Sequence, residues 1–367
     1  MKTGAELVVQ VLTDAGVKYV FGIGGDSVIA LIDAVDRTPD ITYMPVRHEQ
    51  VGTSMADGYA RVSGDPAVVL AHMGPGVCNV VIGLASAYRD SSPVIALTGA
   101  RELHMLGRDS WHELDQLGLL RPITKWNARI NSANSAPRVM REALTRALTG
   151  RPGPVHIELP KDIAKAKSEV EIGDPLSVAT LKEAARVAPN PDLVKKGCDL
   201  LLSAERPLIF GGGGVLKSGA SEKLLSFCQI LGIPVATTNK GRSCIPEDHP
   251  LCAGPAGRYG TPFASDEVKK ADVLLGLGCR FSDLSTLNWS IISPGTKIIH
   301  VDIDPKELGR QYEEKVSIVG DVKSFLQAAI HELEGRRVPK PGAASPETNP
   351  RLATLVKERE AERASFF

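Results

Sequence analysis

Short apolar runs that alternate with helical patterns are the feature that most constrains how this chain can fold. Glycine or proline bounds most of the runs, and stretches with helical periodicity separate them. The runs lie at 18–23, 41–46, 66–73, 93–100, 153–160, 206–216, 233–238, 271–278 and 296–304. Continuous apolar strands are typical of parallel sheets that helices cover on both faces. The pattern therefore predicts an α/β protein with doubly wound parallel sheets.

The length of 367 residues exceeds what one compact core usually holds, so two domains are expected. We predict a first domain over 1–168 and a central domain over 185–337, joined by a charged linker without clear periodicity. Residues 338–367 are predicted to be a linker or tail that ends in a charged helix and leads to a third domain outside this sequence.

Charge and cysteine usage exclude several classes of function. Lysine plus arginine and aspartate plus glutamate both total 43, so no basic surplus favours nucleic acid or an anionic membrane. No apolar segment approaches the roughly 18 residues of a membrane span. The six cysteines form no C-x-x-C pair, which favours reduced thiols in a cytoplasmic protein over a disulfide framework or a zinc site.

Glu49 stands at the start of a predicted helix. Val51, Met55, Tyr59 and Val62 recur with helical spacing and predict an apolar stripe, which places Glu49 in or just before the first turn. A carboxylate there is stabilised by the helix dipole, so a purely structural role is one interpretation. Three glycine-rich turns, at 21–27, 72–79 and 210–219, allow either tight βα turns or close approach to a ligand.

Six ordered motifs give these features a common interpretation. They are FGIGGDS, RHEQVGTSMADGYAR, GPGVCNVVIGLASAYRDSSPVIALTG, DSWHELDQLGLLRPITKW, GRPGPVHIELPKDI and VDIDPKELGR. In this order they resemble the thiamine-diphosphate enzymes of the acetolactate synthase group, from about residue 3 to about residue 335. The resemblance implies a pyrimidine-binding domain followed by a Rossmann-like central domain.

The resemblance implies that Glu49 hydrogen-bonds N1′ of the cofactor's aminopyrimidine ring. A carboxyl that shares its proton with N1′ allows the 4′-amino group to act as the base that removes the thiazolium C2 proton. A glutamine could form the hydrogen bond but could not transfer the proton. Gly24, Gly25, Pro75 and Asn79 are the other implied cofactor contacts, although Gly24 replaces a common proline.

Trp111 and His112 stand where acetolactate synthases commonly carry Phe-Gln, so they are the implied substrate contacts. His112 is the candidate for a second acid or base, and a supporting or surface histidine is the alternative. The stretch Glu113 to Gln116 is similar to one in lyases and decarboxylases of 2-hydroxyacyl or oxalyl thioesters.

In the central domain, the resemblance implies a nucleotide site that includes Gly212, Gly213, Arg280 and Asp302. The candidate ligands are FAD and a coenzyme A or ADP moiety. The alternative is that the central domain binds no nucleotide, because many relatives use it only as a scaffold.

None of the Gly-Asp pairs in this chain is followed by glycine, whereas the family binds Mg²⁺ and the diphosphate with a Gly-Asp-Gly motif in a third domain. The resemblance therefore predicts that this chain binds no metal. A second polypeptide of about 200 residues would hold Mg²⁺, in a hetero-oligomer with at least two copies of each chain. A truncated polypeptide is the alternative.

The leading hypothesis is a subunit of a split thiamine-diphosphate enzyme that decarboxylates and condenses 2-oxo acids. A 2-hydroxyacyl-CoA lyase or oxalyl-CoA decarboxylase is the second hypothesis, and a non-catalytic scaffold or regulatory subunit is the third.

Overall fold

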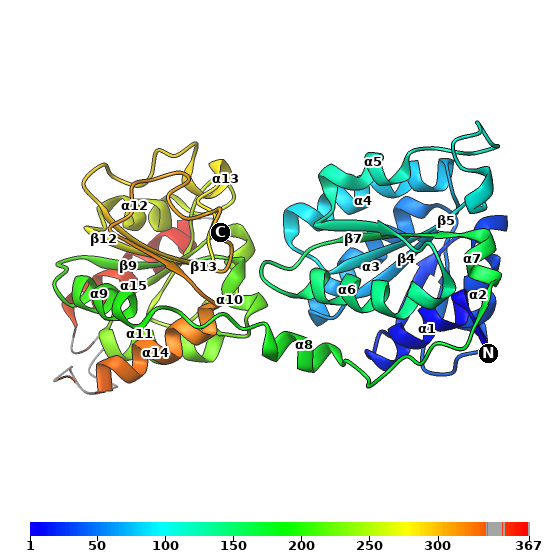
Figure 1. The fold of residues 1–367 in the computed structure, drawn as a ribbon. Coiled ribbons are helices and arrows are strands. Elements are labelled where there is room, and N and C mark those ends of the chain that lie inside the picture. The colour runs from blue at the N-terminus through cyan, green and yellow to red at the C-terminus, as the bar shows by residue number, and fades with distance from the viewer. Residues whose placement is uncertain (335, 337–346, 348, 366–367) are drawn as a thin grey trace. The chain divides into compact units, whose positions relative to one another are not determined.

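The computed structural model describes residues 1–334, 336, 347 and 349–365, which form two compact units, Met1–Ala185 and Arg186–Phe367 (Figure 1). Each unit is built on a six-stranded sheet in which all strands run parallel. The prediction of two doubly wound parallel sheets is confirmed. No helix among the described residues is long and apolar enough to cross a membrane.

The sheet of the first unit has the order β3-β2-β4-β5-β7-β6. Its strands are β2 (Tyr19–Gly22), β3 (Thr42–Pro45), β4 (Ala67–Ala71), β5 (Val94–Ala100), β6 (Trp126–Arg129) and β7 (Val155–Pro160). The sequence patterns predicted all of these except β6, a four-residue edge strand whose residues are only half-buried. A separate antiparallel pair joins β1 (Lys2–Thr3) to β8 (Lys167–Ser168).

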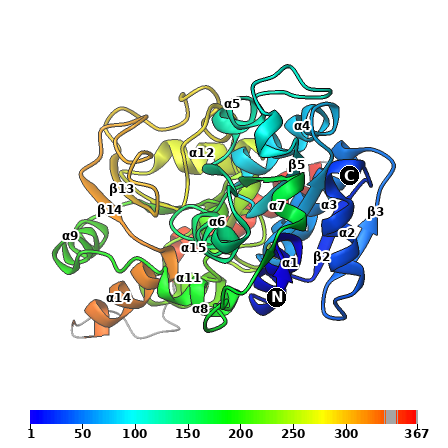
Figure 2. The same cartoon turned by 45° about the vertical axis from the view of Figure 1, so that its right-hand side comes forward.

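Side chains of successive strand residues enter two different cores in the first unit. Val68 and Leu70 of β4 face one core, whereas Val69 and Ala71 face the other. The first core contains residues of α1 (Gly4–Asp14), α2 (Ile29–Asp36), α6 (Ala136–Leu148) and α8 (Val178–Ala184). The second contains residues of α3 (Glu49–Ser63), α4 (Pro75–Asp90) and α5 (Gln116–Leu120). Figure 2 shows α7 (Lys161–Lys165) beside α1 and α2, which it contacts.

The buried face of α3 differs from the predicted one. Val51, Met55 and Val62 are 51%, 38% and 92% exposed, so the predicted apolar stripe was wrong as a core face. The buried face of α3 includes the small residues Gly52, Thr53, Ala56 and Ala60. A Cβ at Gly83 of α4 would lie 2.5 Å from the Cβ of Thr53. The two helices therefore approach too closely for larger side chains between them.

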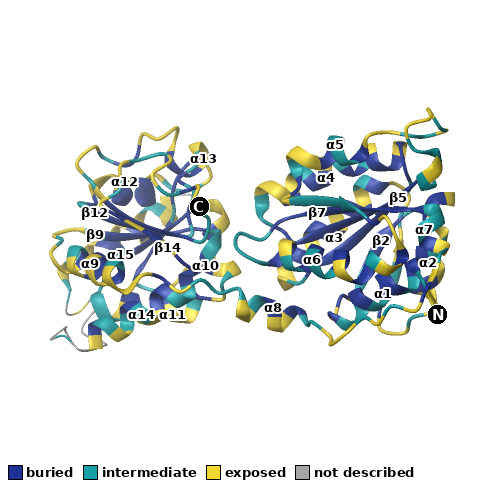
Figure 3. Cartoon of the chain, in the orientation of Figure 1, coloured by how far each residue is buried: buried dark blue, intermediate teal, exposed yellow. Residues whose placement is uncertain are grey.

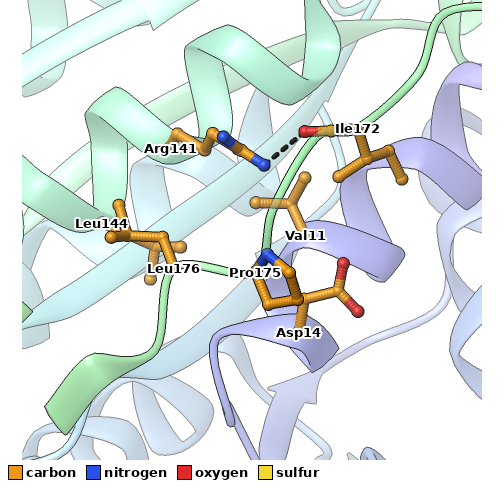
Figure 4. Close-up of a pocket in the computed structure, with 7 residues that line it drawn as sticks. All are labelled: Val11, Asp14, Arg141, Leu144, Ile172, Pro175 and Leu176. Carbon is orange, nitrogen blue, oxygen red and sulfur yellow. Dashed lines mark hydrogen bonds between the residues drawn. The ribbon is translucent and has the colours of Figure 1, made fainter. Parts of the chain in front are cut away.

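The segment 169–184, expected to be a surface linker, instead packs on the first unit. Val178 and Leu181 of α8 are buried in its core. Figure 4 shows how this segment borders a pocket with α1 and α6, where Arg141 donates a hydrogen bond to the carbonyl oxygen of Ile172. Arg141 also donates to the carbonyl oxygen of Asp174. One short helix with two buried apolar residues suffices for this docking, which is too short a pattern to be recognised in the sequence.

The second unit has the strand order β11-β10-β9-β12-β13-β14. The strands are β9 (Pro207–Gly211), β10 (Val235–Thr237), β11 (Cys252–Pro255), β12 (Val273–Leu277), β13 (Lys297–Asp302) and β14 (Val316–Val319). Its helices are α9 (Pro191–Leu202), α10 (Gly213–Lys217), α11 (Ser221–Leu231), α12 (Pro262–Lys270), α13 (Asp283–Thr286), α14 (Val322–Glu334) and α15 (Pro350–Ser365). Figure 3 shows central strands of both sheets in the dark blue of buried residues, such as β5 in the first unit and β9 and β12 in the second. The short edge strands β11 and β14 escaped prediction.

The C-terminal helix α15 is part of the second unit. Leu352 and Leu355 are buried in its cores, and Arg359 is only 5% exposed. The guanidinium of Arg359 donates hydrogen bonds to the carbonyl oxygens of His249 and Cys252, at 2.9 and 2.6 Å. The charged helix expected at the end of the chain is therefore docked. The expected linker at 338–349 lies largely outside the described residues.

Candidate functional site

Glu49 is the first residue of α3, as its sequence position predicted. The carboxylate is 6% exposed, and its Oε2 accepts a hydrogen bond of 2.8 Å from Nδ2 of Asn79 on α4. His48 caps the helix, because its Nδ1 accepts the backbone N–H of Gln50 at 3.2 Å. His48 itself is exposed, so the structure gives it a capping function in the helix.

The turn between β4 and α4 brings three of the predicted positions together, Glu49, Pro75 and His112. Gly76, which follows the exposed Pro75, has no side chain, and a Cβ there would lie 3.0 Å from Oε1 of Glu49. Gly74 has a φ of 67°, and a Cβ there would lie 2.6 Å from the carbonyl oxygen of His112. Glycine at these positions lets the carboxylate and the loop that carries His112 approach the N-terminus of α4.

Gln116 anchors the loop between β5 and α5, which carries His112, to the sheet by hydrogen bonds. Its Oε1 accepts the N–H of Gly74 at 3.1 Å, and its Nε2 donates to the carbonyl oxygen of Gly99 and to Oε1 of Glu158, both at 3.0 Å. Gln116 is 2% exposed. Burial raises the pKa of Glu158, and Arg129, whose Nε donates to Oε2 at 3.0 Å, opposes that rise. The loop is thereby tied to the carboxyl ends of β5 and β7.

Trp111 and His112 lie next to each other at the tip of the loop. Their rings stack with centroids 3.6 Å apart and an interplanar angle of 16°. Trp111 is 62% exposed, and His112 is half-buried with a φ of 61°. Left-handed backbone is uncommon outside glycine and asparagine, and such strain often marks functional loops. Backbone N–H groups of Gly107 and Ser110 donate to Glu113 and lower its pKa.

Two residues of the site, Ser27 and His72, were not singled out from the sequence. Oγ of Ser27 lies 2.8 Å from Nδ1 of His72, and Nε2 of His72 lies 3.4 Å from Nδ1 of His112. The available signal was a histidine at the carboxyl end of β4, within the second glycine-rich turn. Burial lowers the pKa of His72, and the neighbouring His112 adds to that effect.

The two glycines of the first turn differ in their surroundings. A Cβ at Gly25 would lie 2.8 Å from the imidazole of His72, so this glycine makes room for that ring. A Cβ at Gly24 would meet only Cδ1 of Ile32, at 3.7 Å. Packing against His72 therefore explains why residue 25 is glycine. No close contact requires glycine at position 24.

The predicted nucleotide residues gather at the carboxyl edge of the second sheet. Gly212 and Gly213 follow β9, Arg280 follows β12, and Asp302 ends β13, which are consecutive neighbours in that sheet. Asp302 is 7% exposed, accepts the N–H of Asp304 at 2.9 Å, and has a pKa raised by burial. Among the described residues of the chain, no group of three or more His, Cys, Asp and Glu side chains could hold a metal ion.

Gly212 has a structural reason that does not depend on a ligand. A Cβ there would lie 2.1 Å from the backbone oxygen of Gly278, which cannot move as a side chain could. We expect Gly212→Ala to destabilise the second unit by about 3 kcal/mol. Gly295→Ala is the matched control, because a Cβ there meets nothing within 4 Å. Urea unfolding, with hydrogen exchange read out at β9 and β12, measures the difference, and equal stabilities would contradict the expectation.

Comparisons with known proteins agree with this arrangement. Residues 2–119 match the family model for the N-terminal TPP binding domain of thiamine pyrophosphate enzymes, and residues 194–329 match the model for their central domain.

Among curated relatives, a probable acetolactate synthase large subunit of Methanocaldococcus jannaschii is 44% identical over 335 residues, covering 90% of this chain and 56% of the relative. The acetolactate synthase large subunit of Buchnera aphidicola subsp. Acyrthosiphon pisum is 36% identical over 332 residues, covering 90% of this chain and 58% of the relative. The isozyme 3 large subunit of Escherichia coli is 34% identical over 341 residues, with shares of 93% and 59%. The chain thus spans somewhat over half the length of these relatives. It belongs to the thiamine pyrophosphate enzymes, and its two units correspond to the N-terminal and central domains of that family.

Proposed function

We propose that this chain is one subunit of a thiamine-diphosphate-dependent enzyme of the acetolactate synthase type, which forms or cleaves a carbon–carbon bond next to a carbonyl group. The buried Glu49 at the start of α3 carries the proposal. The curated relatives are acetolactate synthase large subunits, which supports decarboxylation and condensation of 2-oxo acids as the reaction.

The surroundings of Glu49 fit the aminopyrimidine end of the cofactor. Asn79 holds Oε2, whereas no hydrogen bond from the described residues reaches Oε1. The absence of a side chain at Gly76 leaves space beside Oε1. Bound thiamine diphosphate supplies a carbon nucleophile and an electron sink. Glu49 would hold a proton at Oε1 and share it with a ring nitrogen, while Pro75, Gly24 and Gly25 would border the ring.

A second polypeptide is proposed to hold Mg²⁺ and the diphosphate. The exposed surfaces of α3 and α4 support a protein partner, because they carry the large apolar residues Val51, Met55, Val62, Ile82 and Tyr88. These side chains belong to the two helices that carry Glu49 and Asn79. A hetero-oligomer with at least two copies of each chain would cover these surfaces. All six cysteines are free thiols, which supports a reducing, cytoplasmic location.

His112 favours a second candidate, a lyase or decarboxylase of 2-hydroxyacyl or oxalyl coenzyme A thioesters. An imidazole beside the stacked Trp111 offers a proton donor that a Phe-Gln pair does not. The carboxyl edge that holds Gly212 and Asp302 supports FAD or an ADP moiety of coenzyme A as a ligand of the central domain.

The test is reconstitution. The purified chain is mixed with Mg²⁺, thiamine diphosphate and the product of a neighbouring gene that encodes a diphosphate-binding domain, and pyruvate and 2-hydroxyacyl thioesters are compared as substrates. Acetolactate formation supports the first candidate, and thioester cleavage supports the second. A mixture that binds the cofactor and turns over neither substrate would contradict both candidates and favour a non-catalytic subunit.

A further inference from the structure

Hydrogen-bond donors on Ser27 determine where His72 carries its proton. The backbone N–H of Ser27 points at Nδ1 of His72 over 3.4 Å, and a backbone N–H can only donate. Oγ of Ser27 lies 2.8 Å from the same nitrogen and already accepts the N–H of Met73 at 3.2 Å. The hydroxyl hydrogen is therefore free to donate to Nδ1. Nδ1 consequently carries a lone pair, and a neutral His72 carries its proton on Nε2.

This proton faces the second histidine. Nε2 of His72 lies 3.4 Å from Nδ1 of His112, a length common for hydrogen bonds in active sites before a substrate binds. Since His72 donates, Nδ1 of His112 must accept, and a neutral His112 must then carry its own proton on Nε2. The stack on Trp111 and the Gly74 turn hold the second ring in place.

Glycines also fix the first ring of the pair. A Cβ at Gly25 would lie 2.8 Å from the His72 ring, and a Cβ at Gly99 would lie 2.2 Å from Oγ of Ser27. Ser27 is 3% exposed, so its hydroxyl has little access to water as an alternative partner. The contact between Ser27 and His72 is thus held by residues at the carboxyl ends of three strands, β2, β4 and β5.

We infer that His72 is a positioning residue, which fixes His112 as the Nε2–H tautomer and so presents that N–H as a hydrogen-bond donor in the site. The role of that donor in turnover rests on the proposed function, because its partner would be an oxygen on the substrate's carbonyl or leaving group. The tautomer itself depends only on this chain. Burial and the neighbouring His112 lower the pKa of His72, which favours its neutral ring, whereas Asp26 and Glu49 act in the opposite direction. A preorganised donor stabilises developing negative charge without having to reorient first.

Two variants of nearly equal size separate donation from mere packing. The side chain of His72→Gln can accept from Ser27 and donate to His112, whereas the carboxylate of His72→Glu can only accept. We expect His112 to be the Nε2–H tautomer in the wild-type chain and in H72Q, and the Nδ1–H tautomer in H72E. Long-range ¹H–¹⁵N spectra of the full chain with ¹⁵N-labelled histidine, at pH 8, read this directly. The chain has eight histidines, and His112→Gln assigns the signal.

The same spectra contain a control for folding. His156 is fully buried in β7, and its signal reports on whether each variant keeps the sheet. The inference is overturned if folded H72Q and H72E show the same His112 tautomer, or if the wild-type chain carries the Nδ1–H form. In the reconstituted enzyme, kcat of H72E should fall about a hundredfold below that of H72Q, the usual effect of losing one charge-stabilising donor. Equal kcat values would overturn the role in turnover, while failure of all forms to turn over, wild type included, would count against the proposed function alone.

Discussion

Glu49→Gln is expected to lower kcat of the reconstituted enzyme by about 10² to 10⁴-fold, the range for loss of a positioned acid or base. Glutamine has the size of glutamate and can still accept the hydrogen bond that Asn79 donates. It has no proton to exchange at the position of Oε1. Binding of the cofactor should weaken much less than kcat falls, and this contrast distinguishes proton sharing from simple contact.

The neighbouring His48→Asn is the matched control for Glu49→Gln. Asparagine is a good helix cap, so this variant should preserve α3 and retain kcat. Thermal unfolding of both variants shows whether the helix start remains intact. Full turnover by a folded Glu49→Gln enzyme would refute the proton-sharing role and leave Glu49 as a helix-terminus acid.

Acid should destabilise the first unit through His156. This imidazole is fully buried between strands, its Nε2 lies 2.8 Å from Oγ1 of Thr98, and its Nδ1 has no hydrogen-bond partner in the part of the chain that the structure describes. Burial lowers its pKa from 6.5 to about 3. The unfolded chain therefore binds a proton below about pH 6.5 that the folded chain rejects down to about pH 3.

The free energy of unfolding should consequently fall as the pH drops through this window. One such group contributes about 3 kcal/mol of lost stability between pH 7 and pH 4. Replacing His156 by glutamine should remove that part of the pH dependence, whatever its effect at pH 7. Carboxylates with lowered pKa, such as Asp57, lose their contribution at lower pH and remain in both proteins.

Urea unfolding at several pH values, followed by hydrogen exchange at β5 and β7, measures the effect. His331→Gln serves as the control, because the His331 side chain is 89% exposed and should not contribute. A wild-type chain and a His156→Gln variant with parallel pH profiles between pH 7 and pH 4 would show that the His156 imidazole accepts a proton in the folded state.

The fold class could be predicted from the sequence because a strand that is buried on both faces is made mostly of apolar residues, and such a run is recognisable by itself. Every residue of β4, β5 and β7 is buried because both faces of the sheet are covered, and most of these residues are apolar. The missed strands β6, β11 and β14 are edge strands of four residues. Edge strands pair on one side only, so their sequences need not be uniformly apolar.

The face of α3 was mispredicted for a different reason. Helical periodicity identifies an apolar stripe but not the surface that the stripe covers. In α3 the core contact requires small residues such as Ala56 and Ala60, so the larger apolar residues are left on the outside. Hydrophobicity alone ranks Val51 above Gly52, whereas the close approach of Gly52 to Val46 and to the backbone of β2 reverses that order.

The candidate site was predictable only in part. The helix-start position of Glu49 and the glycine turns before α2 and α4 have local patterns, and the structure places them as expected. The contact of Ser27 with His72 joins residues 45 positions apart, and that of His72 with His112 joins residues 40 positions apart. These contacts form only because the ends of particular strands are neighbours in the sheet. The order of the strands cannot be predicted from any single sequence motif.

The exposed apolar side chains of α3 and α4 also bear on how the protein must be produced. A chain made without a partner exposes the large apolar side chains of Val51, Val62 and Ile82, and exposed apolar surface favours aggregation. Under the proposed function, co-expression with the second polypeptide should therefore recover more usable material than separate preparation.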